Sequence, residues 1–474
     1  MLHVADRRLT DTQRELLHGR LERAVKRARR RGAALAGLTL PLDATVDPAA
    51  VAVASRRAGE PYFLFEQPDR GGSALAGLGC VHALEDHGPL RFRRVSAEWR
   101  ALASLAQADA PDGPAGAGLV AVGGFAFADE GGRAPHWQGF APASLHVPEI
   151  AIARADGDVR LTIAALARPD DTADELLARA EARLAELVER PLPLLDPAPA
   201  GRTAVSSVMP PEHFEHAVSR ATDRIERGDF EKIVLVREVA VHTAGDHDAP
   251  AAFDVLRQAF RECYVFCVGR GDAAFVAASP ELLVRREGSR AQTVALAGSI
   301  RRSADPAVDD HLGEQLLRSA KDREEQEIVV RRIASTLRRH AVWVAAPDEP
   351  TVVKVANIQH LATPIRAQLR EPVGALELAG ALHPTPAVGG EPHGAAIDVI
   401  PMLEGLDRGW YAGAIGWTDA SEDGEFCVGL RCALLRGREA RCYAGVGVVR
   451  DSDPAAELAE TEVKLGALLP VLAL

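Results

Sequence analysis

Short apolar segments of strand length recur along the whole chain, and a few long stretches of helical spacing stand between them. Before residue 200 the strand-like segments include PYFLFEQ, GLVAVGGFAFA and EIAIAR, separated by turns rich in glycine and aspartate. After residue 200 they include KIVLVREVAVH, YVFCVG, AAFVAASP, EFCVGLRCALL and RCYAGVGVV, and they alternate with helical stretches at 211–230 and 309–340. The pattern predicts mixed α and β structure in both halves of the chain.

A proline-rich segment divides the chain near residue 200. The stretch RPLPLLDPAPAG, residues 190–201, carries four prolines and follows the helical pattern DELLARAEARLAELVER. At 474 residues the chain is long enough for two domains or one large layered domain. We therefore separate a β-rich amino-terminal part, residues 1–200, from residues 201–474, which carry the candidate site.

Charge and apolar pattern exclude two kinds of partner. The formal net charge of −12 disfavours nucleic acid, whose binders usually carry a basic field. No run of about 18 apolar residues occurs, so no membrane span is expected. The first forty residues mix acidic with basic side chains and lack the apolar core of a signal peptide, and the six cysteines form no CxxC pair. These features predict a cytoplasmic protein with reduced thiols.

Nucleotide-binding motifs are missing from the sequence. It contains no GxxxxGK[ST] and no complete GxGxxG between a strand and a helix. Gly445 and Gly447, in YAGVGVV, lie instead inside a strand-like run. Glycines in a strand indicate that another strand or a ligand approaches the backbone closely.

Two helical segments each place a pair of acids three residues apart. Asp322 and Glu325 lie in KDREEQEIVV, and Glu457 and Glu460 lie in DPAAELAETEVKL, with Lys464 one turn further on. Such pairs ordinarily decorate solvated helix faces. If the helices instead bring the four carboxylates together, a cation must offset their repulsion, and oxygen ligands alone favour Mg²⁺.

A lysine and a glutamate stand next to predicted strands. Lys232 opens the strand KIVLVREVAVH, and Glu281 follows Ser279 and Pro280 in AASPELLVRR. A lysine on a strand commonly guards against edge pairing, and a glutamate after proline is commonly a charge at a helix start. Alternatively, the two act as base and acid across one substrate.

The ordered motifs KIVLVRE, SPELLVRR, ALAGSIRR, KDREEQ, NIQHLATPI, LHPTPAVGGEP, WYAGAIGW, FCVGLRCALL, YAGVGVV and AETEVKL carry a family resemblance. The chain resembles the chorismate-utilising enzymes, which include anthranilate synthase component I, aminodeoxychorismate synthase component I, salicylate synthase and isochorismate synthase. The match is densest from about residue 205 to 470 and looser before it, through PYFLFEQPDR and GGFAFADEGG. It implies an α/β (α+β) fold of large layered β-sheets with helices packed outside, built from both halves as one unit.

Three positions indicate the branch of the family. Lys232 stands where water-using members keep a lysine base, and Ala297 replaces the nucleophilic lysine of aminodeoxychorismate synthases. LHPTPAVGGEP, residues 382–392, is most similar to the isochorismate synthase version. Gln326, where many members have histidine, and Ser299, where salicylate synthases have threonine, depart from the pattern. The resemblance thus implies an isochorismate synthase that acts as a monomer on chorismate without an obligatory amidotransferase subunit.

Two other functions remain open. A salicylate synthase would carry the same intermediate onward by eliminating pyruvate. A binding subunit that retains the fold without catalysis would be expected to lack Lys232 or Glu281, and both are present.

The resemblance also implies catalytic roles. Neutral Lys232 would take a proton from the water that attacks C2 of the chorismate ring. Protonated Glu281 would give a proton to the departing C4 hydroxyl, and the reaction would run in either direction. Both groups must be held against their protonation states in water.

The remaining roles concern binding. Arg431 and Tyr411 would hold the enolpyruvyl carboxylate, and the backbone amides at Gly445 and Gly447 would complete an anion site with Lys464. Mg²⁺ would grip the ring carboxylate, with Glu325 and Glu460 closest to the metal and Asp322 and Glu457 holding its waters. His360 and Ser299 are expected in the pocket without an assigned role.

Overall fold

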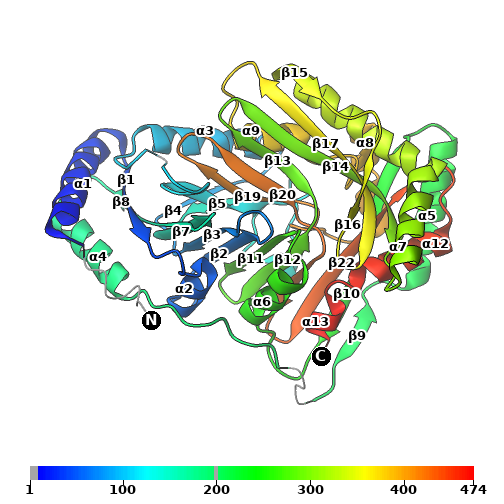
Figure 1. Cartoon of the computed structure of the whole chain (residues 1–474), viewed down its shortest axis with the longest axis horizontal. Coiled ribbons are helices and arrows are strands. Elements are labelled where there is room, and N and C mark those ends of the chain that lie inside the picture. Colours follow the sequence, from blue (N-terminus) through cyan, green and yellow to red (C-terminus); the bar gives the residue numbers. More distant parts are fainter. Residues whose placement is uncertain (1–8, 111, 197–200, 474) are drawn as a thin grey trace.

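Two large antiparallel sheets make up the body of the molecule (Figure 1). The computed structural model describes residues 9–110, 112–196 and 201–473. Within them, the first sheet runs in the order β1-β8-β7-β3-β2-β11-β12-β21-β22-β10-β18, with β9 also paired to β10. Its strands are β1 (Ala34–Leu42), β2 (Tyr62–Gln67), β3 (Ser73–Leu78), β7 (Ile150–Ala155), β8 (Asp158–Ala167), β9 (Ala204–Ser207), β10 (Lys232–His242), β11 (Tyr264–Arg270), β12 (Ala273–Ser279), β18 (Gly390–Glu391), β21 (Cys432–Arg436) and β22 (Glu439–Val448).

The second sheet runs in the order β15-β17-β14-β13-β20-β19-β5-β6-β4, with β16 also paired to β17. Its strands are β4 (His82–Asp86), β5 (Val120–Phe125), β6 (Ala143–Val147), β13 (Leu282–Glu287), β14 (Arg290–Arg301), β15 (Ala341–Ala345), β16 (Thr351–Lys354), β17 (Ile358–Leu369), β19 (Ala414–Asp419) and β20 (Gly424–Val428). β2 pairs with β11 in the first sheet, and β5 pairs with β19 in the second. Both sheets therefore take strands from both sides of residue 200.

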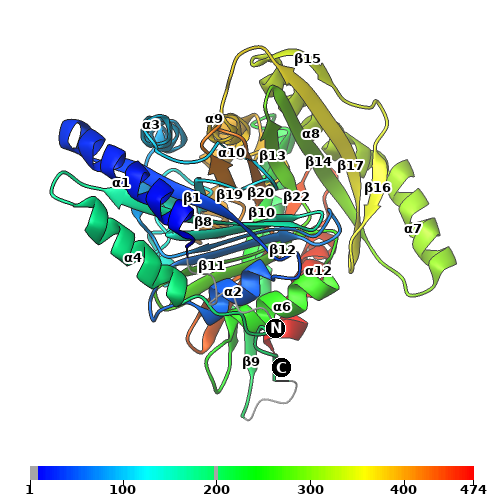
Figure 2. The same ribbon diagram turned by 60° about the vertical axis from the view of Figure 1, so that its left-hand side comes forward.

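Helices pack against the two sheets (Figures 1 and 2). They are α1 (Asp11–Arg31), α2 (Pro48–Ala54), α3 (Arg91–Ser104), α4 (Ala173–Ala185), α5 (Pro211–Glu226), α6 (Ala249–Ala259), α7 (Pro306–Arg318), α8 (Ala320–Arg338), α9 (Ala375–Leu382), α10 (His393–Ile397), α11 (Ile400–Glu404), α12 (Pro454–Leu465) and α13 (Leu469–Leu472). α1, α4 and α6 contact the first sheet, whereas α3, α8 and α9 contact the second. The mixed, layered fold expected from the sequence is confirmed.

Two apolar cores hold these layers together. The larger one lies between the sheets and joins residues of both, such as Phe63 and Phe266 of the first sheet and Phe125 and Phe426 of the second. The smaller one lies between the first sheet and its covering helices, and includes Leu21 of α1 and Phe253 of α6. Removing this apolar surface from water is the main favourable contribution to such a layered fold.

Individual elements follow the sequence pattern with two exceptions. β10 begins and ends where its apolar run predicts, at Lys232 and His242. The helical stretch at 309–340 is broken at Ser319, whose extended backbone ends α7 and whose hydroxyl accepts the Asp322 amide to cap α8. The run EFCVGLRCALL, expected to be one strand, is two strands, because β20 belongs to the second sheet and β21 to the first.

Two other features bear on the sequence expectations. Residues 197–200 of the proline-rich segment lie outside the described residues, and the preceding residues, 187–196, form no helix or strand. Among the helices that the structure describes, none is both long and apolar enough to cross a bilayer.

Candidate active site

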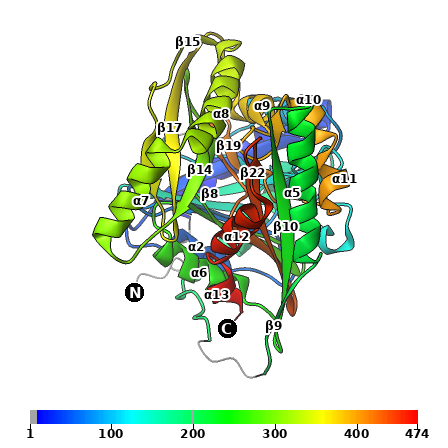
Figure 3. The ribbon, with the colours of Figure 1, turned by 90° about the vertical axis from the view of Figure 1, so that its right-hand side faces the viewer.

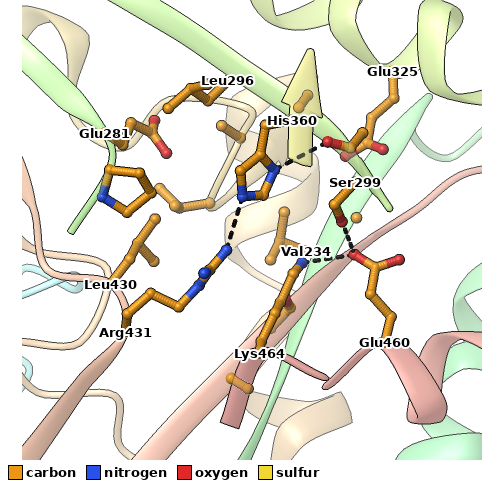
Figure 4. A pocket seen from close by; sticks show the side chains of 18 of the residues that line it. Val234, Glu281, Leu296, Ser299, Glu325, His360, Leu430, Arg431, Glu460 and Lys464 are labelled. Carbon is orange, nitrogen blue, oxygen red and sulfur yellow. Dashed lines mark hydrogen bonds and ion pairs between the residues drawn. The ribbon is translucent and has the colours of Figure 1, made fainter. Parts of the chain in front are cut away.

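One cavity lies where the two sheets meet α8 and α12 (Figure 4). Figure 3 shows the ribbons of these two helices. Its walls include most of the residues singled out in the sequence: Glu281, Ser299, Glu325, His360, Tyr411, Arg431, Gly445, Gly447, Glu460 and Lys464. Lys232, Asp322 and Glu457 lie just behind these walls. Lys232 is beside the lining residue Glu325, Asp322 is beside the lining residue Gly298, and Glu457 pairs with Lys321. The chain thus brings all thirteen predicted residues into one region.

Lys232 and Glu281 are buried polar groups supplied by the strands. Lys232 begins β10, is fully buried, and places its Nζ 2.9 Å from Glu325 Oε1. Glu281 lies between β12 and β13, so it does not begin a helix. Its backbone carbonyl accepts the Val428 amide at 3.0 Å, which fixes the junction against β20.

The environment of Glu281 favours its protonated form. Burial raises the pKa of its carboxyl to about 8, although the cations Lys232, Arg431 and Lys464 act in the opposite direction. A carboxyl with this pKa carries its proton at neutral pH. Glu281 therefore has the protonation state that a general acid requires.

Arg431 is a buried cation that has no carboxylate partner among the described residues. Its Nη2 donates to His360 Nε2 at 2.8 Å, and His360 Nδ1 lies 3.1 Å from the Gly298 carbonyl (Figure 4). Because a guanidinium can only donate, His360 Nε2 is the acceptor. Nδ1 therefore carries the ring proton and donates a hydrogen bond to the Gly298 carbonyl. Burial, followed by the nearby Arg431 and Lys464, lowers the pKa of His360 to about 3, so the imidazole stays neutral.

The position of Arg431 follows from the crossing between the sheets. The chain leaves β20 in one sheet and enters β21 in the other over Gly429, Leu430 and Arg431, and Arg431 has a left-handed φ of 47°. The Ala412 amide donates to the Gly429 carbonyl at 2.8 Å, which ties this turn to the segment that carries Tyr411. Tyr411 is also buried. A left-handed arginine in this turn is a strained position that the surrounding hydrogen bonds maintain.

The four predicted carboxylate ligands come from α8 and α12. Figure 4 shows Glu325 and Glu460 on the side of the cavity opposite Arg431 and Glu281. Glu460 accepts from Ser299 and lies 2.7 Å from Lys464 Nζ. Glu457 pairs with Lys321, and Asp322 accepts from Ser319. Among the described residues, no three acidic, histidine or cysteine side chains converge on a single point.

The electrostatics of this wall suit a divalent cation. Burial raises the pKa of Asp322, and Glu325 and Glu460 add to that effect. Burial also raises the pKa of Glu457, and Glu460 adds to it. Burial opposes the charged form of Glu460 as well, but Lys464 and Ser299 together hold its pKa below the ordinary value. Carboxylates that lie close enough to raise one another's pKa form an oxygen donor set compatible with Mg²⁺.

Gly447 and Gly298 are placed where a side chain would not fit. A Cβ at Gly447 would lie 2.1 Å from Glu325 Oε1 and 3.0 Å from Lys232 Cε. Gly298 has a φ of +67° at the bulge in β14, and a Cβ there would lie 2.9 Å from Asp322 Cβ. The close approach expected at the YAGVGVV glycines is thus observed at Gly447.

Several lining residues were not predicted individually: Val234, Pro280, Leu296, Gly298, Val388, Leu430, Tyr443 and Ala444. Most are apolar, so nothing in their residue type distinguishes them from core residues. Val388 and its neighbour Ala387 belong to LHPTPAVGGEP, which the sequence had singled out as a segment. Leu430 and Tyr443 lie close in sequence to predicted residues, and that proximity is the only signal they carry.

Comparisons with known proteins agree with this geometry. Residues 20–473 match the family model described as "Chorismate binding enzyme". The chain is 39% identical over 412 residues to the salicylate biosynthesis isochorismate synthase of Pseudomonas aeruginosa, covering 87% of this chain and 85% of the relative. It is 34% identical over 355 residues to isochorismate synthase MenF of Bacillus subtilis, covering 75% of each.

Solved structures show the same fold. MenF, the menaquinone-specific isochorismate synthase from Escherichia coli, has a TM-score of 0.77 at 26% identity and covers 96% of this chain and 100% of its own. Anthranilate synthase component I from Streptococcus pneumoniae has a TM-score of 0.60 at 22% identity, over 74% of this chain and 80% of its own, and supports the fold alone.

Proposed function

This chain belongs to the chorismate-binding enzyme family, and from that premise we propose that it is an isochorismate synthase, which interconverts chorismate and isochorismate. The relatives named isochorismate synthase support the reaction type. The observation that carries the proposal is the presence, beside one cavity, of a buried Lys232 and of a Glu281 whose pKa is about 8. The family resemblance implies that ammonia-using members have lost this lysine, so its presence supports a water-using enzyme.

In the proposed reaction Lys232 and Glu281 move the protons. Neutral Lys232 removes a proton from the water that attacks C2 of the ring. The double bonds shift, the bond between C4 and its hydroxyl breaks, and Glu281 protonates the hydroxyl so that it leaves as water. One water enters and one leaves, so substrate and product are isomers, and a proton returns from Lys232 to Glu281 to complete the cycle.

Arg431 orients the substrate in this proposal. Its guanidinium is buried, fixed by His360 and without a carboxylate partner among the described residues, which suits a carboxylate of the substrate. The Tyr411 hydroxyl lies beside Gly445, since a Cβ at Gly445 would be 2.9 Å from it. Together they form an anion site on the strand side of the cavity.

We further propose that Mg²⁺ is the cofactor, held by Glu325 and Glu460, with Asp322 and Glu457 supporting its waters. When bound, it supplies positive charge for the ring carboxylate of chorismate. That charge is needed because the protein as a whole is acidic. Lys232, Lys464 and Lys321 each lie next to one of these carboxylates, which they would share with the ion.

The first test is product analysis with the purified protein. Chorismate and Mg²⁺ are incubated without ammonia, the products are separated by chromatography with mass detection, and pyruvate is measured in parallel with lactate dehydrogenase. A new product of unchanged mass without pyruvate is expected, and isochorismate supplied as substrate should return chorismate.

Two other outcomes would identify a different activity. Salicylate with an equimolar amount of pyruvate would establish the salicylate synthase alternative; the name of the Pseudomonas aeruginosa relative mentions salicylate biosynthesis but calls that protein an isochorismate synthase. Turnover that appears only when ammonia is added would overturn the proposal in favour of an aminating enzyme.

A further inference from the structure

The middle of β10 lacks a strand partner along one edge. Among the described residues, β18 pairs with Lys232 and Ile233, and β9 pairs with residues from Val239 to His242 on the same edge. Between these two short strands the Val234 amide donates to the Gly389 carbonyl at 2.7 Å. The Val234 carbonyl and the Val236 amide face the gap, and a buried backbone group without a partner is costly.

A buried ion pair fills this gap. Glu404 ends α11 and Arg408 follows one turn later, and the residues are 3% and 4% exposed. Glu404 Oε1 accepts the Val236 amide at 2.9 Å, and Arg408 Nη2 donates to the Val234 carbonyl at 2.8 Å. Arg408 Nε also donates to Glu404 Oε2 at 2.9 Å. Two side chains therefore take the hydrogen-bonding place of a strand.

The same arginine also holds the loop on the opposite side of the gap. Arg408 Nη1 donates to the Val388 carbonyl at 2.8 Å. Val388 lies in LHPTPAVGGEP, and both Val388 and Val234 line the cavity. Phe127, from the amino-terminal half, stacks on the guanidinium, with 4.1 Å between its ring centroid and Arg408 Cζ. Arg408 thus joins two parts of the cavity wall without lining the cavity itself.

Each of the two wall segments that Arg408 holds lies near a proposed proton-transfer group. Lys232 is two residues before Val234 on β10. Thr385 is three residues before Val388. Burial is the main influence on the pKa of Glu281 and raises it, and the nearby Thr385 hydroxyl, which forms no hydrogen bond within the described residues, is a lesser influence in the opposite direction. A shift of either carbonyl would therefore displace the wall beside Lys232 or the loop that carries Thr385.

We propose that Glu404 and Arg408 are positioning residues that set the spacing between the Lys232 side and the Glu281 side of the cavity. The inference rests on the proposed function for its kinetic readout. A plain stability role would be shared by any buried ion pair, whereas a positioning role belongs only to a pair bonded to the cavity wall.

Arg183 offers a matched control. It is fully buried and pairs with Glu60, Glu149 and Glu186, so it resembles Arg408 in burial and charge. Its backbone partner is the Ser55 carbonyl in the amino-terminal half, and neither residue lines the cavity. Replacing either arginine by lysine keeps the charge but removes the planar fork that reaches several acceptors.

The experiment compares Arg408→Lys with Arg183→Lys in the full chain. Both variants are expected to lower Tm, whereas only Arg408→Lys should lower kcat, by about 10- to 100-fold, because misplacement of reacting groups by about 1 Å has an effect of that size. KM for chorismate should change much less than kcat. Equal kcat values in the two variants would overturn the proposal.

Backbone amide hydrogen exchange gives a readout that does not need turnover. Arg408→Lys should speed exchange at residues 385–390 and at Val236, and Arg183→Lys should not. If the wild-type protein does not convert chorismate, the proposed function fails, and the exchange data still decide whether Arg408 holds the loop. Unchanged exchange in Arg408→Lys would overturn the inference.

Glu404→Gln covers the case in which Arg408→Lys does not fold. Its amide oxygen can still accept the Val236 amide, but the ionic bond to Arg408 is lost. A fall in kcat that exceeds the change in KM is expected, with faster exchange at 385–390. Glu404→Gln with wild-type kinetics and wild-type exchange would contradict a positioning role.

Discussion

The two sides of the cavity are built in different ways. The strand side consists of residues fixed by sheets and their junctions: Lys232, Glu281, Arg431, Gly445 and Gly447. The helix side consists of side chains from α8 and α12: Asp322, Glu325, Glu457, Glu460 and Lys464. The fully buried side chain of Lys232 contrasts with that of Glu460, which is 28% exposed.

This difference separates two tasks. Strand hydrogen bonds hold Lys232 and Glu281 in place, so their geometry is set before any ligand arrives. On the helix side, Glu457 and Glu460 form ion pairs with the long side chains of Lys321 and Lys464, and such pairs can exchange one cation for another at little backbone cost. We therefore expect variants on the strand side to change kcat and variants on the helix side to change the requirement for Mg²⁺.

The largest effect should come from Lys232→Ala. Loss of a general base lowers kcat by about 10²- to 10⁴-fold. Steady-state kinetics with chorismate measures it, and Lys26→Ala, at an exposed position on α1, is the control. If the Lys232→Ala variant keeps its activity, Lys232 is not the general base, and the strand side does not supply it.

Gly447→Ala should have the next largest effect, because its Cβ would clash with a residue on each side of the cavity. The methyl group would displace Glu325 and Lys232, and a displacement of about 1 Å lowers kcat by about 10²-fold. The control is Gly394→Ala, since no heavy atom lies within 4 Å of a Cβ there. Similar kinetics in both variants would mean that this contact is not part of the working geometry.

Glu457→Gln tests the helix side alone. It should weaken Mg²⁺ binding by about 10- to 100-fold, the usual effect of changing a group that supports a metal site. Calorimetric titration of Mg²⁺ gives the affinity without turnover, and Glu324→Gln, at an exposed position on α8, is the matched control. If kcat at saturating Mg²⁺ falls as far as in Lys232→Ala, the separation of tasks is wrong.

The smallest effect concerns pH. Since Glu281 must be protonated to act as the acid, activity should decline by about tenfold per pH unit above its pKa of about 8. Its ordinary pKa is 4.5, so between pH 4.5 and 8 the unfolded chain loses a proton that the native protein keeps. Ionisation therefore lowers the free energy of unfolding as pH rises through this range.

Glu281→Gln checks that sign. The variant cannot ionise at this position, so its free energy of unfolding should vary less between pH 5 and 8 than that of the wild-type protein, as measured by urea unfolding at each pH. If, from pH 5 to 8, the free energy of unfolding of the wild-type protein rises relative to that of Glu281→Gln, Glu281 is ionised in the native state.

The sequence predicted the strand side better than the supporting contacts. β10 could be placed to the residue because its apolar run, interrupted only by Arg237 and Glu238, marks a strand buried on both faces. The division of EFCVGLRCALL between two sheets could not, because apolar residues continue through Gly429 and Leu430 and only the tertiary pairing reveals the crossing. The mixed fold followed from local patterns, whereas the sheet order depends on contacts between distant segments.

The supporting residues were missed for a different reason. Glu404 and Arg408 are four apart, which is also the spacing of ordinary surface ion pairs on helices. Asn357 and Gln359 bind the Val463 carbonyl of α12 and Asp309 of α7, respectively, but NIQHLATPI reads simply as an apolar strand with polar members. Gln326 donates to the Ala295 carbonyl and to Thr363, which anchors α8 beside Glu325. Burial distinguishes such groups, and burial is a tertiary property.

The crossing from β20 to β21 gives the cavity a mechanical consequence. Arg431 stands where the chain passes from one sheet to the other, α8 packs on β14 and β17 of the second sheet, and α12 packs on β22 of the first. A small anion bound at the same time by Arg431 and by groups on both helices would link the two layers. We therefore expect a bound anion to resist sliding of one layer over the other.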